Sequence, residues 1–265
     1  MKERIRANLP ADHPWGDGIL WFDTIDSTNT RAKELARSGA AHGTVLLADT
    51  QTGGRGRMGR NFHSPAGTGI YFSLILQPRC RPGQLMHLTC AVAVAMCDAV
   101  EAATGLRPGI KWTNDLVFGK RKLGGILTEL GLKADGTVDF AIVGIGLNCA
   151  QTAQDFPPEI REIATSLSAA TGEYPDRAAV IAAMIRALHR MDAGLLTEKE
   201  QMLCRYRQDC VTLGKEISLL RGDQVSHGKA ITVDAEGALV VEYPDGRTEA
   251  VSSGEVSIRG MYGYL

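Results

Sequence analysis

The feature that most constrains this chain is a pair of apolar runs separated by a long segment rich in glycine and arginine. Residues 44–50 (TVLLADT) and 69–77 (GIYFSLILQ) have the length and the β-branched or aromatic side chains of buried strands. The segment 51–67 between them exceeds the ~12–15 residues beyond which a connection without regular structure is usually functional or disordered. The pattern predicts two core strands joined by a functional loop.

Further strand-like and helix-like segments surround this pair. Residues 18–23 (GILWFD) are predicted as a strand, and the run Asp26–Asn29 supplies N-cap residue types for a helix over 31–37. In residues 177–196 the apolar side chains recur with the spacing of one helical face. The other predicted elements are a helix over 83–104, a short strand over 108–112, a hairpin of 116–118 with 122–130, a strand over 138–147 paired with it, and a helix over 197–211.

The sequence changes character at Gly214. From there short alternating runs are separated by turn dipeptides, Gly222-Asp223, Glu236-Gly237 and Asp245-Gly246. This spacing is typical of a small all-β barrel or sandwich of about 50 residues. We therefore expect two domains, residues 1–213 and 214–265.

Composition excludes several classes of protein. Lys and Arg number 29 and Asp and Glu 30, which gives a formal charge of −1, while 44% of the residues are hydrophobic. These values exclude a disordered chain and a broadly basic nucleic-acid coat. The histidines show no HxxxH or HxH spacing, so no metal site built by the protein is predicted.

Cysteine usage and hydropathy indicate a cytoplasmic protein. The charged start, residues 1–6, is not followed by the apolar region of a secretory signal. The most apolar stretch, Leu85–Val100, is interrupted by His87 and Asp98 and is shorter than the ~20 residues a bilayer needs, so we expect a buried helix. The cysteines form no CxxC pair and lie mostly in apolar stretches, which predicts reduced, buried thiols: Cys80, Cys90, Cys97, Cys149, Cys204 and Cys210.

The run Gly53–Arg60 (GGRGRMGR) has the composition of an anion-binding loop. Its glycines leave backbone amides unobstructed, and its three guanidinium groups suit a polyanion such as a triphosphate. It is not a Walker A loop, because Gly59 is followed by Arg60 rather than by Lys and Ser or Thr. A mobile surface loop and an RNA tether are the alternatives.

Three further motifs contain clustered polar groups or paired glycines. Lys111–Asp115 (KWTND) places a cation, an aromatic ring, an amide and a carboxylate at a strand end, which indicates either a cleft or a polar turn. Lys122 precedes Gly124 and Gly125, which permit a close approach by a ligand or another backbone, although a solvated hairpin is the alternative. The pair Gly144 and Gly146 lacks the third glycine and the helix of a dinucleotide fingerprint.

Taken in order, these segments resemble the biotin protein ligase family from about Trp21 to Arg259. The resemblance depends on six motifs: Asp26-Ser27-Thr28-Asn29, Gln51 with Gly54–Arg60, Ser64-Pro65, Lys111–Asp115, Lys122–Leu127 and Gly144–Asn148. It implies an α+β fold, in which a central mixed β-sheet flanked by helices, of the class II synthetase-like kind, precedes a small SH3-like β-barrel. The chain departs from the family at Thr113, where proline is usual, and at Phe62, where some members have tryptophan.

The resemblance also implies a set of site residues. Side chains and glycines at the start of the predicted helix, in the loop and on the glycine-containing strands are expected to bind biotin: Ser27, Thr28, Asn29, Gln51, Gly54, Arg55, Gly56, Arg57, Lys122, Gly125, Gly144 and Gly146. ATP and the adenylate are expected at Arg55, Arg57, Arg60, Phe62, Asn114, Lys122 and Asn148. The expected catalytic residues are Arg57, Lys111, Lys122 and Asp115.

The implied reaction is the ATP-dependent attachment of biotin to a lysine. Biotin and ATP are the substrates, Mg²⁺ arrives with ATP, and the acceptor is a biotin carboxyl carrier domain of acetyl-CoA carboxylase or of another biotin-dependent carboxylase. A lipoate ligase or related acyl transferase on the same fold is the nearest alternative, and an RNA-binding module is a second. Because 25 residues precede Asp26, too few for the helix-turn-helix of the DNA-binding members, no DNA partner is expected. No membrane partner is expected either. The oligomeric state is open, a homodimer included.

Overall fold

A seven-stranded mixed sheet forms the centre of the protein. In the computed structural model, which describes residues 1–252 and the backbone of 257–260, its strand order is β1-β2-β3-β7-β6-β5-β4. β1 and β2 pair in parallel and the other neighbours are antiparallel. The strands are β1 (Ile19–Ile25), β2 (Thr44–Gln51), β3 (Gly69–Leu76), β4 (Gly109–Lys111), β5 (Asp115–Phe118), β6 (Arg121–Leu132) and β7 (Val138–Asn148).

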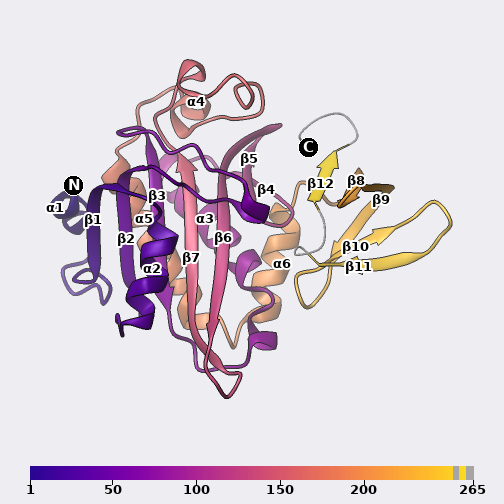
Figure 1. The fold of residues 1–265 in the computed structure, drawn as a ribbon. Coiled ribbons are helices and arrows are strands. Elements are labelled where there is room, and N and C mark those ends of the chain that lie inside the picture. The colour runs from indigo at the N-terminus through magenta and orange to yellow at the C-terminus, as the bar shows by residue number, and fades with distance from the viewer. Residues whose placement is uncertain (253–256, 261–265) are drawn as a thin grey trace.

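Helices cover the sheet unequally on its two faces (Figure 1). On one face the single helix α2 (Thr28–Arg37) packs on β2, β3 and β7 and leaves the sheet beyond its first turn uncovered. The apolar helices α3 (Leu88–Thr104) and α5 (Arg177–Gly194) pack together behind the other face, where α1 (Lys2–Ala7) and α6 (Lys199–Asp209) join them. The main apolar core therefore lies behind the sheet, and the opposite face is available for a site.

A second, five-stranded antiparallel sheet follows α6 and lies beside the β4 edge of the first (Figure 1). Its order is β11-β10-β9-β8-β12, and its small size and antiparallel pairing are those of an SH3-like barrel. The indole Nε1 of Trp112 donates to the carbonyl of Gly237 at 3.0 Å and so links the two sheets. The strands are β8 (Glu216–Arg221), β9 (Gln224–Val233), β10 (Leu239–Glu242), β11 (Thr248–Val251) and β12 (Ser257–Gly260).

Most of the predicted elements are present close to their predicted bounds. The predicted helix over 83–104 is divided, because residues Pro82–Leu85 form a 3₁₀ turn before α3 begins at Leu88. The segment Pro82–Thr104 is long and apolar enough to cross a membrane, yet 72% of its most apolar window is buried inside the protein. The short helices α1 and α4 (Leu167–Thr171) and the strand β12 were not predicted.

The cysteines differ from the prediction at one position. Five are buried free thiols, but Cys204 is exposed on α6. Apolar neighbours in the sequence do not bury it, because α6 packs on α3 with its other side, through Met202, Leu203 and Tyr206.

Tyr206 supports the turn that leads from β4 into β5. Its ring is fully buried, its hydroxyl donates to the carbonyl of Thr113 at 3.1 Å, and burial raises the pKa of this phenol well above its usual value. We expect Tyr206→Phe to lower the free energy of unfolding by about 1–2 kcal/mol, because a buried carbonyl loses a donor. Tyr206→Ala also opens a cavity and is expected to cost about 3–5 kcal/mol.

Urea unfolding measures both values. The control is Tyr174→Phe, because Tyr174 is 74% exposed. Equal stability of the Tyr206→Phe and Tyr174→Phe proteins would show that the buried hydroxyl adds nothing.

Candidate active site

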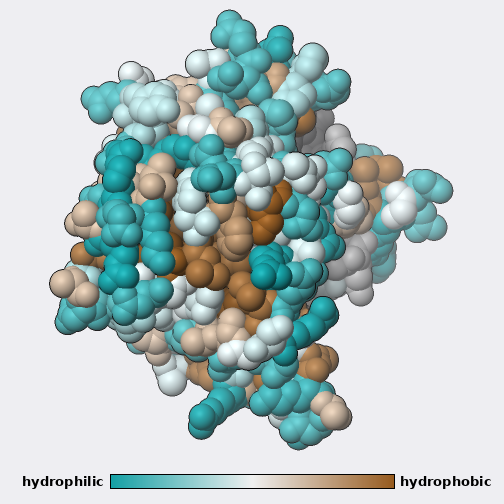
Figure 2. Space-filling model, turned by 60° about the vertical axis from the view of Figure 1, so that its left-hand side comes forward, coloured by the Kyte–Doolittle hydropathy of each residue, from teal (hydrophilic) through white to brown (hydrophobic). Residues whose placement is uncertain are grey.

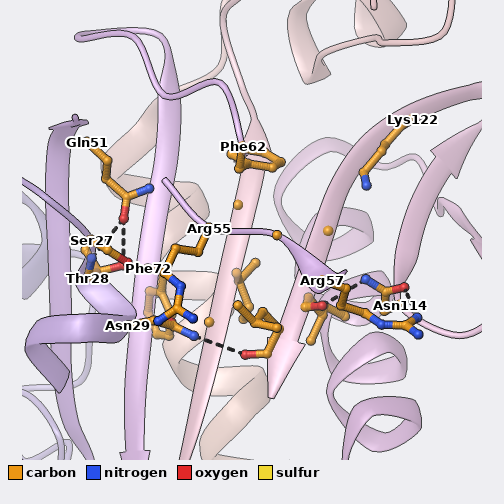
Figure 3. A pocket seen from close by; sticks show the side chains of 17 residues that line it. Ser27, Thr28, Asn29, Gln51, Arg55, Arg57, Phe62, Phe72, Asn114 and Lys122 are labelled. Carbon is orange, nitrogen blue, oxygen red and sulfur yellow. Dashed lines mark hydrogen bonds between the residues drawn. The ribbon is translucent and has the colours of Figure 1, made fainter. Parts of the chain in front are cut away.

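A cavity lies over the middle of the seven-stranded sheet, next to the first turn of α2. Figure 2 shows hydrophobic residues gathered in a hollow with hydrophilic residues around it, and Figure 3 shows the polar side chains in two groups, one on each side of Phe62. The loop after β2, the turn before β5, and strands β3, β6 and β7 contribute to the wall. The lining residues are Ser27, Thr28, Asn29, Gln51, Arg55, Gly56, Arg57, Phe62, Phe72, Asn114, Lys122, Gly125, Ile126, Leu127, Gly144, Ile145 and Gly146.

The first group of polar side chains is built at the start of α2. Ser27 is the N-cap of this helix, and its Oγ lies 3.5 Å from the backbone amide of Thr30. Thr28 donates to Gln51 Oε1 twice, from its backbone amide at 2.9 Å and from Oγ1 at 3.1 Å. Gln51 Nε2 in turn donates to Ser64 Oγ at 3.0 Å. The glutamine therefore connects the helix start to the far end of the glycine-rich loop.

Asn29 forms the back of this group and is 5% exposed. Its Nδ2 donates to the carbonyl of Leu127 at 3.3 Å and to Glu129 Oε2 at 3.0 Å, while its Oδ1 accepts from Ser73 Oγ at 2.6 Å. A Cβ at Gly144 would lie 2.1 Å from this oxygen. Asn29 lines the cavity, but all its polar atoms are bonded to protein groups, so it holds the wall in place.

The glycine-rich loop folds back on itself over the cavity. The amide of Phe62 donates to the carbonyl of Gly54 at 2.9 Å, and the amide of Gly56 donates to the carbonyl of Arg60 at 2.7 Å. The turn between them, at Met58, has a left-handed backbone with φ 55°. Two arginines of this hairpin, Arg55 and Arg57, line the cavity, whereas Arg60 is exposed.

The second group of polar side chains is cationic. Arg57 Nη1 donates to Asn114 Oδ1 at 2.8 Å, and burial lowers the pKa of this guanidinium, which stays protonated. Lys122 Nζ donates to Asp115 Oδ1 at 2.7 Å. A Cβ at Gly125 would lie 3.3 Å from Lys122 Nζ, so the glycine leaves the ammonium room at the cavity wall.

A second loop reaches the cationic group from the end of β7. The backbone of Lys122 bonds to this loop on both sides, accepting from the amide of Thr165 at 2.8 Å and donating to the carbonyl of Ile163 at 2.7 Å. The ring of His63 lies 3.1 Å from the carbonyl of Asp155, so the two loops also touch each other. The cavity is thus bounded by two loops that meet above the sheet.

Phe62 separates the two polar groups (Figure 3). A Cβ at Gly146 would lie 2.5 Å from its ring, so the phenyl group rests directly on the backbone of β7. The ring also meets Tyr71 edge to face, with 6.4 Å between centroids. The apolar floor between the polar groups comes from Phe72, Ile126 and Ile145.

Several predicted site residues are not on the cavity wall. Lys111 is 6% exposed on β4, and Asn148 Nδ2 donates to the carbonyl of Thr165 at 2.9 Å. Arg60 is exposed on the loop, and Asp115 reaches the site through Lys122. Gly54 packs against the loop itself, where an added Cβ would lie 2.4 Å from the Phe62 carbonyl oxygen.

The peptide bond between Trp112 and Thr113 is cis.

Sequence analysis did not identify some residues that contribute to the site. These are Ser64 in the glycine-rich loop and the strand residues Phe72, Ser73 and Glu129. Ser64 reaches the site through its bond to Gln51, and strand pairing brings the other three there, because Ser73 pairs with Gly144 and Gly144 with Leu127. Within residues 1–252 and 257–260, no three His, Cys, Asp or Glu side chains gather to hold a metal ion.

Two family models match the sequence. The model described as the biotin/lipoate A/B protein ligase family matches residues 21–148, and that of the biotin protein ligase C-terminal domain matches residues 212–259. The first match covers the strands and the glycine-rich loop of the cavity, and the second covers the five-stranded sheet.

Relatives and solved structures agree with these matches. The chain is 38% identical over 246 residues to the bifunctional ligase/repressor BirA of Bacillus spizizenii, covering 92% of this chain and 75% of that protein. It is 32% identical over 273 residues to the biotin–[acetyl-CoA-carboxylase] ligase of Mycobacterium tuberculosis, covering 97% and 98%. A structure of the Aquifex aeolicus biotin protein ligase in complex with biotin and ATP superposes with a TM-score of 0.77 at 32% identity, covering 91% and 98%.

The contact between Asn29 and Gly144 predicts the effect of one added methyl group. In Gly144→Ala the new Cβ would lie 2.1 Å from Asn29 Oδ1, and the buried amide has no room to retreat. We expect the free energy of unfolding to fall by about 1–3 kcal/mol, as overpacked cores show. In the control Gly83→Ala no atom lies within 4 Å of the new Cβ, so we expect a change within about 0.5 kcal/mol. Equal stability of the two variants in denaturant unfolding would contradict the packing described.

Proposed function

Because the chain belongs to the biotin protein ligase branch of the biotin/lipoate A/B protein ligase family, we propose that it attaches biotin to protein in two steps. It first makes biotinyl-5′-AMP from biotin and MgATP. It then transfers the biotinyl group to a lysine of a biotin carboxyl carrier domain, in acetyl-CoA carboxylase or another biotin-dependent carboxylase. The observation that carries this proposal is the division of the cavity into a neutral hydrogen-bonding end and a cationic end.

The neutral end suits the ureido ring of biotin. A ureido group presents a carbonyl acceptor and two N–H donors, so it needs donors and acceptors side by side. The Ser27 hydroxyl and the Thr28–Gln51 pair offer hydroxyl and amide groups at the start of α2. Thr28 and Gln51 are bonded to each other, and Ser27 Oγ accepts from the amide of Thr30. Groups that are already oriented lose little freedom when the ligand binds, which favours affinity.

The apolar middle suits the remainder of biotin. Phe62 and Phe72 enclose the space between the polar ends, and Gly146 lets the phenyl ring of Phe62 approach the sheet. A ring sulfur and a hydrocarbon chain lying there would lose contact with water, which contributes roughly 25 cal/mol for each Å² of apolar surface buried.

The cationic end suits the first chemical step. An oxygen of the biotin carboxylate attacks the α-phosphorus of ATP, the bond to the bridging oxygen of the β-phosphate breaks, and pyrophosphate leaves. Two anions must meet, so positive groups held in place lower the barrier by offsetting their repulsion and the charge that develops at phosphorus. Arg57 and Lys122 supply that charge at the cationic end, and Arg55, which also lines the cavity, holds its guanidinium nearer α2, 3.9 Å from Glu129 Oε1.

Hydrogen bonds already hold two of these cations in position. Asn114 holds Arg57 and Asp115 holds Lys122, so neither has to be immobilised when the phosphates arrive. We propose adenylate-side roles for Arg60, Phe62 and Asn148 as well, and a supporting charge at Lys111 behind the wall.

In the second step the carrier lysine attacks the acyl carbon of the mixed anhydride as a neutral amine. The new C–N bond forms, the bond from the acyl carbon to the phosphate oxygen breaks, AMP leaves, and the proton released from the nitrogen passes to water. Asp115 is the carboxylate we propose to orient that amine. It lies at the cationic end, where the acyl phosphate forms.

The two loops protect the intermediate. Biotinyl-5′-AMP hydrolyses in water, so an enzyme that makes it gains by excluding water until the carrier arrives. The glycine-rich loop folds as a hairpin over the cavity, and His63 of this loop contacts the carbonyl of Asp155 in the loop after β7.

Magnesium enters this scheme with ATP. Within the described part of the chain no acidic cluster could hold the ion by itself, so we propose that the phosphates of ATP carry it into the site. There it would neutralise charge on the triphosphate.

The remaining assignments are also proposals. We place the domain division at residues 213 and 214, the protein in the cytoplasm and a homodimer among its states, and we expect weak, non-specific DNA binding at a net charge of −1.

Lipoate attachment is the alternative that the cavity allows us to test. A linear acyl chain needs an apolar tunnel, whereas the end of this cavity at Thr28 and Gln51 carries hydroxyl and amide groups. We expect biotin, and not lipoate, to support pyrophosphate release from MgATP, because a chain with no ureido group leaves those polar groups without partners. Equal pyrophosphate release with lipoate in a coupled assay would refute the assignment.

The cationic end gives a second prediction. We expect Lys122→Ala and Arg57→Ala each to lower kcat/KM for carrier biotinylation by about 10²–10³, the usual cost of losing one positioned donor. Folding should be little changed, because both side chains are partly exposed to solvent. The control is Lys120→Ala, an exposed cation in the same hairpin, which should keep the full rate. Near-normal rates in both site variants would mean that Lys122 is an ordinary solvated residue of the hairpin and Arg57 an ordinary solvated residue of the loop.

A further inference from the structure

Glu129 lies outside the cavity wall but contacts three residues of the site and its surroundings. On β6 its Oε2 accepts from Asn29 Nδ2 at 3.0 Å, and its Oε1 accepts from Lys33 Nζ at 2.8 Å. The guanidinium of Arg55 is 3.9 Å from the same Oε1, too long for a hydrogen bond. The principal contacts of Glu129 are therefore with Lys33 and Asn29, both on α2.

This carboxylate determines which way the amide of Asn29 points. With Nδ2 toward Glu129 and the carbonyl of Leu127, both amide hydrogens have acceptors and Oδ1 faces Ser73. In the flipped amide the oxygen would face a carboxylate and a carbonyl, two acceptors at once. Burial alone would raise the pKa of Glu129, but the hydrogen bonds from Lys33 and Asn29 outweigh it and lower that pKa, so the group is ionised.

The orientation of the Asn29 amide affects the hydrogen bonds of two hydroxyl groups, Ser73 and Thr28, that lead to the cavity. Ser73 has one hydroxyl hydrogen and two acceptors in reach, Asn29 Oδ1 at 2.6 Å and Thr28 Oγ1 at 2.8 Å. With Oδ1 facing it, this hydrogen is shared between the two acceptors, and the shorter bond to Asn29 takes the larger part. In the flipped amide Nδ2 would donate to Ser73 Oγ, and the Ser73 hydrogen would go wholly to Thr28 Oγ1. The Thr28 hydroxyl donates to Gln51 Oε1, so Thr28 Oγ1 keeps acceptor capacity on the cavity side.

We propose that Glu129, held by Lys33, is a positioning residue that makes Thr28 Oγ1 an acceptor for a ureido N–H of biotin. The inference rests on the proposed function and adds a residue that does not touch the ligand. Glu129 acts through Asn29 and Ser73, so its loss changes binding of the ring and leaves the reacting atoms alone.

Replacement of the carboxylate by an amide tests the idea. In Glu129→Gln the single side-chain oxygen turns to the Lys33 ammonium, so an NH₂ group faces Asn29 and favours the flipped amide. We expect the Kd for biotin alone, measured by calorimetry, to rise about tenfold, while kcat at saturating biotin changes less than about twofold. In Lys33→Met the carboxylate still accepts from Asn29, so Kd stays within about threefold of wild type.

The double variant Lys33→Met/Glu129→Gln is the decisive protein. Without the ammonium, the glutamine oxygen is available to Asn29, and we expect Kd to return to within about threefold of wild type. In a Ser73→Ala background, where the hydroxyl chain is broken, Glu129→Gln should change Kd by less than about twofold. The exposed Glu34, paired with Arg31 on the same helix, supplies the control Glu34→Gln, which should leave Kd unchanged.

The outcomes separate this inference from the proposed function and from a structural role. An unchanged Kd in Glu129→Gln, or an equal defect in the single and double variants, overturns the inference. A purely structural role would lower Tm without the recovery in the double variant. If wild-type protein binds no biotin, the proposed function fails first.

Discussion

The packing of Asn29 against Gly144 is the contact on which the site depends. It brings the first turn of α2 against the centre of the sheet, where β3, β7 and β6 run side by side. A buried amide is tolerated only when its hydrogen bonds are made, and here a hydroxyl from β3 and a carbonyl and a carboxylate from β6 make them. Because those partners belong to two strands of the central sheet, the wall of the cavity is as rigid as the sheet itself.

Beyond this contact the cavity has two ends that differ in the kind of side chain lining them. Near α2 the Thr28 and Gln51 groups that line the cavity are neutral and bonded to each other, which suits recognition by shape and hydrogen-bond pattern, while the Lys33–Glu129 ion pair and the Arg55 guanidinium lie close by. At the far end Arg57 and Lys122 each have a partner, Asn114 and Asp115. Neutral hydrogen bonds contribute about 1 kcal/mol each, and charged ones about 1.5–3 kcal/mol. The two cations at the far end therefore direct stronger interactions toward the place where phosphate must sit.

Local patterns predicted most of the fold and part of the site. The apolar runs predicted β2 and β3, and the glycine turn at 119 predicted the β5–β6 hairpin, because these depend on neighbours in the sequence. Helix α1 escaped prediction because six residues form no stable helix alone; packing on α5 supports it. Glu129 and Ser73 looked like ordinary strand residues, since only the pairing of β3 with β7 and β7 with β6 brings them to Asn29. The segment Lys111–Asp115 was predicted to face a cleft or to form a polar turn, yet Lys111 itself is buried on β4.

We propose that one end of the cavity recognises the ring of biotin and that the other end recognises its carboxylate. The direct measurement compares the affinities of biotin and of its alcohol analogue, which keeps the ring and lacks the charge, in two variants. Lys122→Met should weaken biotin about tenfold and leave the alcohol nearly unchanged, whereas Gln51→Leu should weaken both ligands alike. An equal loss for both ligands in Lys122→Met, or a loss confined to biotin in Gln51→Leu, would contradict the division of the cavity.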